Sequence, residues 1–250
     1  MQNRGNKVAV IILAAGMGTR MKSGKPKVLH EILGKPMVKY VIKTANKVAG
    51  SNVILVVGNQ AEKVRKALSK DDELIFVLQG KQLGTGHAVL CALPYIPEYI
   101  EQVVILCGDV PLLSSNTVMR LLDDHIKKNR DVTLLAVEAD NPAGYGRVLF
   151  DKNMDVFEIV EEVDASEEQK KIKVINTGIY CAKKKSLIDS LHKIKPDNAQ
   201  GEYYLTDIIE IEYLEKKVVG VLIGTDCDEV VGVNNDKELV AAENIMRTMS

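Results

Sequence analysis

The feature that most constrains this chain is a glycine-rich loop that follows its first apolar run. The run Val8–Leu13 is short and apolar, which predicts a buried strand, and the loop Leu13–Met21 reads LAAGMGTRM. Glycines at the end of a strand let a phosphate approach bare backbone N–H groups. Arg20 and Lys27 place positive charge beside the loop, where phosphoryl charge develops in a transfer reaction. The loop therefore predicts a site for a phosphorylated ligand.

The spacing of the glycines excludes two familiar phosphate-binding loops. A P-loop needs serine or threonine after its Gly-Lys pair, whereas proline follows both Gly24-Lys25 and Gly34-Lys35. A dinucleotide-binding fingerprint needs a third glycine where Met21 stands. The remaining pattern, Gly-x-Gly-Thr-Arg followed by Pro26-Lys27, resembles the signature of the sugar-nucleotide pyrophosphorylases, which join a sugar 1-phosphate to a nucleoside triphosphate. An ordinary glycine-rich turn on a basic surface is the alternative interpretation.

Composition excludes several other classes of protein. The chain has 250 residues and a net charge of -1, so no overall field attracts nucleic acid or an anionic membrane. Aromatic residues make up only 4%, which argues against a base-stacking platform. The polar start Met1–Lys7 and the short run after it match neither a signal peptide nor a membrane span. Four scattered cysteines and four unpaired histidines predict reduced thiols, no structural zinc and a cytoplasmic location.

Apolar runs alternate with helical segments along the first half of the chain. This alternation predicts an α/β fold with a Rossmann-like, doubly wound, mostly parallel sheet, and ligands outside the carboxyl ends of its strands. The expected strands are Val8–Leu13, Val53–Val57, Glu73–Leu78, Val103–Cys107 and Val132–Val137. The expected helices are Met37–Val48, Ala61–Leu68, His87–Leu93 and Asn116–Lys128.

The alternation changes after Asp140. Two short apolar runs flank Asp151-Lys152-Asn153, which predicts a β-hairpin. Since no linker rich in proline, glycine or serine follows, we expect a β insertion over the same sheet rather than a second domain. The expected boundaries are a nucleotidyltransferase domain over 1–234 and a C-terminal helix over 235–250. The further expected strands are Tyr145–Phe150, Val156–Val160, Lys173–Cys181 and Val218–Ile223, and the helices are Lys184–Lys193 and Tyr204–Glu215.

Two stretches at expected strand ends carry candidate ligand-binding groups. Gln79 and Gln82 offer the paired donor and acceptor that read a pyrimidine edge, and Gly84-Thr85-Gly86 lets a flat base lie against backbone. A βα loop with a polar cap is the alternative. Asp109 suits Mg²⁺, with Asn234 as the candidate partner ligand, although a capping aspartate is the commoner use of such a residue.

Nine ordered stretches resemble the uridylyltransferase domain of the bifunctional bacterial N-acetylglucosamine-1-phosphate uridyltransferases. They cover Val8 to Asn235 and read LAAGMGTRM, PKVLH, QLGTGHA, GDVPLL, NPAGYGRV, IVEEVDA, INTGIY, EYYLTDII and GVNN. The resemblance implies a nucleotide-diphospho-sugar transferase fold with a sugar-binding β insertion. It also implies synthesis of UDP-N-acetylglucosamine and pyrophosphate from UTP and N-acetylglucosamine 1-phosphate, a step that supplies peptidoglycan. A homo-oligomer is compatible with it.

The resemblance also implies roles for individual residues. Arg20, Lys27 and Asp109 would be catalytic, with Arg20 and Lys27 on the triphosphate, and Asp109 with Asn234 would hold Mg²⁺. Gly146, Glu161 and Asn176 would hold the amino sugar. The full set implied to bind substrate is Leu13, Ala14, Ala15, Gly16, Lys27, Gln79, Gly84, Thr85, Cys107, Gly108, Asp109, Gly146, Glu161, Asn176 and Asn234.

The sequence departs from the family pattern at two positions. Cys107 stands where an aromatic residue is typical, and Val163 where a lysine is usual. We hypothesise that Lys22 and Lys25 compensate for the missing cation. These 250 residues contain no hexapeptide-repeat acetyltransferase domain, so neither acetyl transfer nor trimerisation through a β-helix is expected. The alternatives are the same chemistry on another sugar 1-phosphate or nucleotide, and a non-catalytic nucleotide-sugar-binding regulator.

Overall fold

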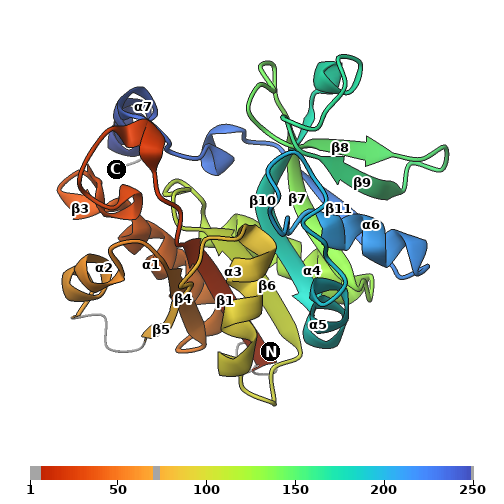
Figure 1. Ribbon diagram of the computed structural model, residues 1–250, viewed down its shortest axis with the longest axis horizontal. Helices are drawn as coiled ribbons and strands as arrows, with labels where there is room; N and C mark the ends of the chain where they lie inside the picture. Colours follow the sequence, from red (N-terminus) through yellow and green to blue (C-terminus); the bar gives the residue numbers. More distant parts are fainter. Residues whose placement is uncertain (1–6, 70–73, 249–250) are drawn as a thin grey trace.

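A central sheet with helices on both faces organises the computed structural model, which describes residues 7–69 and 74–248 (Figure 1). Seven strands follow one path in the order β11-β7-β10-β6-β1-β4-β5, and the β8–β9 hairpin branches from it through β10. The Rossmann-like prediction is thereby confirmed. The strands are β1 (Val8–Ala14), β4 (Val53–Val57), β5 (Leu74–Leu78), β6 (Gln102–Cys107), β7 (Val132–Glu138), β8 (Arg147–Phe150), β9 (Val156–Val160), β10 (Val174–Lys183) and β11 (Val219–Gly224).

Two apolar cores, one on each face of the sheet, explain why the strands read as continuous apolar runs. Along β1, Val10 and Ile12 belong to one core, whereas Ala9 and Ile11 belong to the other. A strand buried on both faces has no polar side to show in its sequence. One core is closed by α1 (Met37–Ala49), α2 (Ala61–Ala67) and α4 (Ser115–Lys127), and the other by α3 (Thr85–Ala92), α5 (Lys184–Leu191) and α6 (Asp207–Leu214).

Most element boundaries fall within a few residues of those expected. α1 ends where Gly50, at φ +59°, donates its N–H to the carbonyl of Asn46, as the expected glycine cap requires. α3 begins two residues earlier than expected, at Thr85 rather than His87. α6 begins at Asp207 rather than Tyr204, because the segment before it is held by hydrogen bonds to the loop at the start of α3. Glu73 and residues 249–250, which the expected strand and C-terminal helix include, lie outside the described residues.

The strand β10 lies in the middle of the sheet and runs antiparallel to both of its neighbours, β6 and β7. The second half of the chain therefore completes the same sheet, as expected, through β10 and β11, and the β8–β9 hairpin is the part that branches away. A bulge interrupts β10 between Asn176 and Ile179, where Gly178 adopts φ +75°. This bulge lies beside the end of β6, at the edge where ligands are expected.

A third, smaller core joins the C-terminal helix to the segment around residues 32–37. Ile32, Met37 and Val233 are buried in it, under the helix α7 (Asp236–Thr248) and the hairpin of β2 (Glu31–Ile32) and β3 (Lys35–Pro36). In Figure 1 this unit lies on the opposite side of the molecule from the β8–β9 hairpin. All four cysteines are free thiols. Across residues 7–69 and 74–248, the helices are too short or too polar to cross a membrane.

Candidate active site

A cavity of about 410 Å³ opens at the carboxyl ends of β1, β5 and β6. It is the place where a doubly wound sheet is expected to hold its ligand. Glu202, which the sequence reasoning did not single out, also lines it. The expected site residues that line it are Leu13, Ala14, Ala15, Gly16, Lys27, Gln79, Gly84, Thr85, Cys107 and Asp109.

A charged cluster at the mouth of this cavity joins residues from three distant parts of the chain. The ammonium group of Lys27, on the short helix η3 (Lys27–Leu29), donates to Asp109 Oδ2 and, at 3.0 Å, to Asn234 Oδ1. Arg20 Nη2 donates to the same Asn234 oxygen at 2.9 Å. The carbonyl of Asp109 accepts from the N–H of Val233 at 2.8 Å, which ties the two loops together. The structure thus brings together all four residues that the sequence assigned to phosphate and metal.

The glycine at position 18 has a packing role as well as a conformational one. Gly18 adopts φ +63°, and a Cβ placed on it would lie 2.6 Å from the Cβ of Lys27. Any larger residue would therefore displace the stem of the lysine. Gly16, by contrast, has nothing within 4 Å of an added Cβ and leaves its backbone open to the cavity.

The oxygens of Asp109 and Asn234 fit a divalent cation. One carboxylate and one amide oxygen converge on a single cationic nitrogen, which shows that they already surround a position where positive charge is stable. Within the described residues no group of three or more His, Cys, Asp or Glu side chains could hold a metal. A cation bound by only two protein oxygens takes its remaining ligands from phosphates and water, which is the coordination that Mg²⁺ favours.

At the other end of the cavity, Gln79 and Gln82 are held by hydrogen bonds within the protein. Gln79 Nε2 donates to the carbonyl of Gly84 at 3.0 Å and lies 3.0 Å from Nδ1 of His87. Gln82 Nε2 donates to the carbonyl of Ala15 at 3.0 Å. The expectation of a paired donor and acceptor therefore needs correction for Gln79, because both of its N–H groups are engaged and only its oxygen remains for a ligand.

The glycines after Gln82 make room for the chain itself. A Cβ on Gly84 would lie 2.5 Å from the carbonyl oxygen of Tyr203, and one on Gly86 would lie 2.9 Å from it. The N–H of Gly86 donates to that oxygen, and Thr85 Oγ1 accepts from the N–H of Leu205. Backbone from the 203–205 segment therefore occupies the side of the loop to which these Cβ atoms would point. Gly84 and Thr85 also line the cavity, and the contact of a base with their backbone stays a prediction.

A second group of expected residues lies around the start of the β8–β9 hairpin. The N–H of Asn176 donates to the carbonyl of Gly146, and an added Cβ on Gly146 would lie 3.3 Å from Glu161 Oε2. Asn176 Oδ1 accepts from the Tyr180 hydroxyl at 2.9 Å, which leaves its amide N–H groups for a ligand. Burial raises the pKa of Glu161, whose Oε1 accepts from the hydroxyl of Thr206.

Glu161 also lines another cavity, of about 420 Å³, whose other charged residues include acidic groups and two lysines. Burial, with Glu210 and Glu161 nearby, raises the pKa of Asp207 to about 7. The neighbouring carboxylates therefore do not all carry full charge near neutral pH.

Cys107 connects the two groups of residues. Its thiol donates to the carbonyl of Gly178 at 3.5 Å across the bulge in β10. Burial raises the pKa of Cys107 to about 12, so its sulfur stays a neutral thiol. Gly108, one residue further, donates its N–H to the carbonyl of Leu13 at 2.8 Å, which joins β6 to β1 and removes that N–H from ligand binding.

Arg147 is a buried residue whose importance the sequence did not reveal. Its side chain is only 2% exposed and pairs with Glu162 at 2.8 Å. The guanidinium also donates to the carbonyls of Tyr145 and Lys170, and Glu162 accepts from the N–H of Gly144. Arg147 thereby fixes the loop that carries Gly146. The signal was present, since the arginine directly follows Gly-Tyr-Gly at the start of a strand.

One of the two lysines expected to compensate for the missing cation is held in an ion pair. Lys25 pairs with Glu31 at 2.9 Å, and Val163 is 57% exposed. The hypothesis that Lys22 and Lys25 replace a cation at position 163 gains no contact in support from this ion pair.

Comparison with known proteins identifies the family of most of the chain. Residues 10–192 match the family described as the MobA-like NTP transferase domain. The chain belongs to this family. A solved structure from Bacillus anthracis, provisionally described as a glucose-1-phosphate thymidylyltransferase, superposes with a TM-score of 0.77 at 20% identity and covers 97% of this chain and 96% of that one. At that identity the likeness concerns the fold of the transferase domain.

Curated relatives of this transferase domain are more similar in sequence. The chain is 46% identical over 237 residues to the bifunctional protein GlmU of Geobacillus sp. strain WCH70, covering 95% of this chain and 51% of that protein. It is 48% identical to the bifunctional protein GlmU of Thermosipho africanus, covering 95% of this chain and 50% of the relative. The chain therefore spans about half the length of the curated relatives it matches.

Proposed function

We propose that this transferase domain is a uridylyltransferase that makes UDP-N-acetylglucosamine and pyrophosphate from UTP and N-acetylglucosamine 1-phosphate. The observation that carries the proposal is the convergence of Lys27, Asp109 and Asn234 at the mouth of the cavity. The similarity to GlmU proteins over 95% of the chain supports the choice of substrates. We assign residues 1–234 to the transferase domain and 235–250 to a C-terminal helix.

In this reaction an oxygen of the sugar phosphate attacks the α-phosphorus of UTP. A new P–O bond forms, the bond to the β-phosphate breaks, and pyrophosphate leaves with the electron pair. The attacking oxygen is already anionic near neutral pH, so no general base is needed, and catalysis consists of positioning and charge neutralisation. Arg20 and Lys27 neutralise the β- and γ-phosphates as charge accumulates on the leaving group.

Asp109 and Asn234 are the residues that would hold Mg²⁺, and a bound Mg²⁺ supplies neutralisation of phosphate charge. In the structure Lys27 contacts both oxygens. We infer that its ammonium group moves from these oxygens to the phosphates when UTP and the cation enter. The backbone at Gly16 and the amide oxygen of Gln79 face the cavity that accepts the nucleoside.

At the sugar end, Gly146, Glu161 and Asn176 would hold the amino sugar. The carboxylate of Glu161 accepts hydrogen bonds from hydroxyl groups, and the free amide N–H groups of Asn176 donate to oxygens of the sugar. Arg147 keeps this end in place through the loop that it binds.

A pyrophosphate-release assay tests the proposal. UTP, Mg²⁺ and N-acetylglucosamine 1-phosphate together should release pyrophosphate, and omission of any one should abolish it. If pyrophosphate is released faster with another nucleotide or sugar phosphate, the assigned substrates would be wrong and the assigned reaction type would stand. Binding of UDP-N-acetylglucosamine without any pyrophosphate release would contradict the proposal and indicate a regulatory protein.

A further inference from the structure

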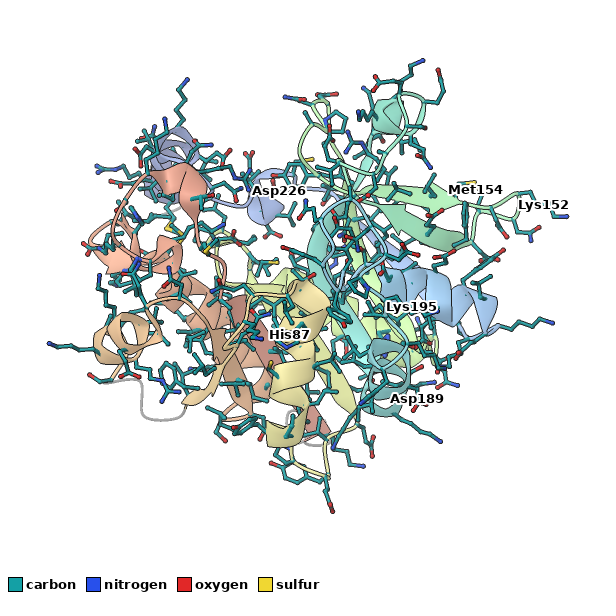
Figure 2. The ribbon with its side chains drawn as sticks, viewed as in Figure 1. His87, Lys152, Met154, Asp189, Lys195 and Asp226 are labelled. Carbon is teal, nitrogen blue, oxygen red and sulfur yellow. The ribbon has the colours of Figure 1, made fainter. Side chains whose placement is uncertain are left out.

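His87 lies on α3 beside the nucleotide cavity and has no role in the proposed mechanism. It belongs to the stretch QLGTGHA and is half-buried. Figure 2 shows it in front of the central sheet, near the middle of the molecule. Its Nδ1 lies 3.0 Å from Gln79 Nε2, its Nε2 lies 3.8 Å from the sulfur of Cys91, and Tyr203 flanks its ring with centroids 6.5 Å apart.

The contacts of Gln79 decide which way its amide points. The carbonyl of Gly84 can only accept a hydrogen bond, so the group that faces it at 3.0 Å is the amide nitrogen. The second N–H of that nitrogen points to Nδ1 of His87. Nδ1 therefore accepts, and the ring proton of the neutral histidine is on Nε2, toward Cys91.

The amide oxygen of Gln79 remains for a ligand. Gln79 lines the cavity and is otherwise buried, with 4% of its surface exposed. Among the residues that the structure describes, this oxygen receives no hydrogen bond. Among the described residues, this oxygen is also absent from the buried polar atoms that lack a partner, so it is open to the cavity. A base that brings an N–H to this position pairs with the oxygen, whereas a base that brings an acceptor does not.

We propose that His87 is a positioning residue for base selection: together with the carbonyl of Gly84 it accepts from Gln79 Nε2 and keeps the Gln79 oxygen turned to the cavity, where it receives the N3–H of uracil. The inference rests on the proposed function, which places uracil in this cavity. Cytosine in the same position presents a bare N3 acceptor to the oxygen, so the two acceptors repel. The same contact does not distinguish uracil from thymine, which carries the same N3–H.

Three substitutions of His87 separate this role from general packing. His87→Leu removes the acceptor. His87→Asn restores it, because its Oδ1 stands in the place of Nδ1, whereas His87→Gln places its amide where Nε2 was. Cys91→Ala is the matched control, since it removes the contact on the opposite nitrogen of the same ring.

The measurement is the ratio of CTP to UTP dissociation constants by calorimetry, with the same ratio of kcat/KM as a second readout. Wild type should prefer UTP, and His87→Leu should lower the preference about tenfold, mainly by weakening UTP. His87→Asn and Cys91→Ala should keep the wild-type ratio, and His87→Gln should behave like His87→Leu. Thermal melting of each variant shows that it is folded.

Distinct results overturn the inference and the function on which it rests. A His87→Leu protein that binds UTP and CTP with the wild-type ratio would refute the role of His87 and leave the proposed function intact. An equal loss of affinity for both nucleotides would show that His87 only packs. A wild-type protein that binds no UTP would refute the proposed function, and the inference would fall with it.

Discussion

The proposed nucleotide side and the proposed sugar side of the site are built in different ways. On the nucleotide side, the parallel strands β1 and β6 end in loops whose backbone is bare, and Gly16 leaves open space above it. On the sugar side, buried polar side chains hold the loops, with Arg147 paired to Glu162 and Asn176 bonded to Tyr180. Parallel strands align their ends by themselves, whereas a hairpin that branches from a bulged antiparallel strand needs side chains to fix it.

The difference teaches where each side is vulnerable. When charged groups on the nucleotide side are removed, the protein should still fold, but its catalytic rate should fall. The sugar side should lose stability when its buried groups are removed, because breaking a buried pair leaves a polar group without a partner.

The largest effect is expected for the charged cluster on the nucleotide side. Lys27→Ala and Asp109→Ala should each lower kcat at least a hundredfold, about 3 kcal/mol or more, because each removes a group that neutralises phosphate charge. Pyrophosphate release measures the rate, and chemical denaturation should show an intact fold. Lys25→Ala, in an exposed pair with Glu31, is the control and should stay close to wild type. Near-normal turnover of either variant would remove that residue from the mechanism.

On the sugar side, Arg147→Ala should lower the free energy of unfolding by about 3 kcal/mol, because the carboxylate of Glu162 and two carbonyls lose their donor. Urea denaturation measures the loss. The control is Arg247→Ala, whose arginine is 64% exposed and pairs with Glu243, and it should change stability by less than about 0.5 kcal/mol. Equal effects of the two substitutions would break the contrast between the two sides.

A buried histidine on α4 lies away from the site, where β6 and β7 begin. His125 is 1% exposed and lies between Gln102 of β6 and Thr133 of β7. Burial, with Lys183 and Arg130 nearby, lowers the pKa of His125 to about 4 from 6.5. Between pH 6.5 and 4, His125 therefore binds a proton in the unfolded chain but not in the folded chain. Its contribution to the free energy of unfolding is fully present above pH 6.5 and is lost as the pH falls toward 4.

The expected loss from His125 is about 2 kcal/mol between neutral pH and pH 5. Urea denaturation across this range measures it as the difference between wild type and His125→Gln, which does not titrate. His192→Gln, at an exposed histidine, is the control and should keep the wild-type slope. A His125→Gln protein with an unchanged slope would show that His125 is already free to take up its proton when folded.

The smallest effect concerns the bulge that joins the two sides. Gly178 adopts φ +75°, and an added Cβ would lie 2.8 Å from the sulfur of Cys107. Gly144 adopts φ +85° with nothing within 4 Å, so Gly144→Ala measures the backbone cost alone. Gly178→Ala should destabilise by about 1 kcal/mol more than this control. The double variant Gly178→Ala/Cys107→Ala should regain that additional stability, because the clash with the sulfur is gone. If its denaturation midpoint does not rise above that of Gly178→Ala, the strain does not come from this contact.

The periodicity of the sequence was sufficient for the strands of the main sheet and for the helices α1 to α7, because each depends on residues close together in the chain. It did not predict the two-residue strands β2 and β3. The run Val53–Val57 forms the expected strand with the same ends, and Gly50 ends the helix before it. The family resemblance brought Lys27, Asp109 and Asn234 into one site, and the structure places them in contact. Their roles in phosphate and metal binding stay predictions until the assays above are done.

What only the tertiary structure decided are the contacts between distant segments. The sequence did not show that β10 runs antiparallel between β6 and β7, because strand order depends on how the two cores pack. Nor did it show that Gly84 faces Tyr203, or that Nδ1 of His87 lies 3.0 Å from the amide nitrogen of Gln79. Local patterns determine which segments fold and which residue types reach a strand end. The direction in which a side chain offers its donor or acceptor depends on partners that only the folded chain brings near.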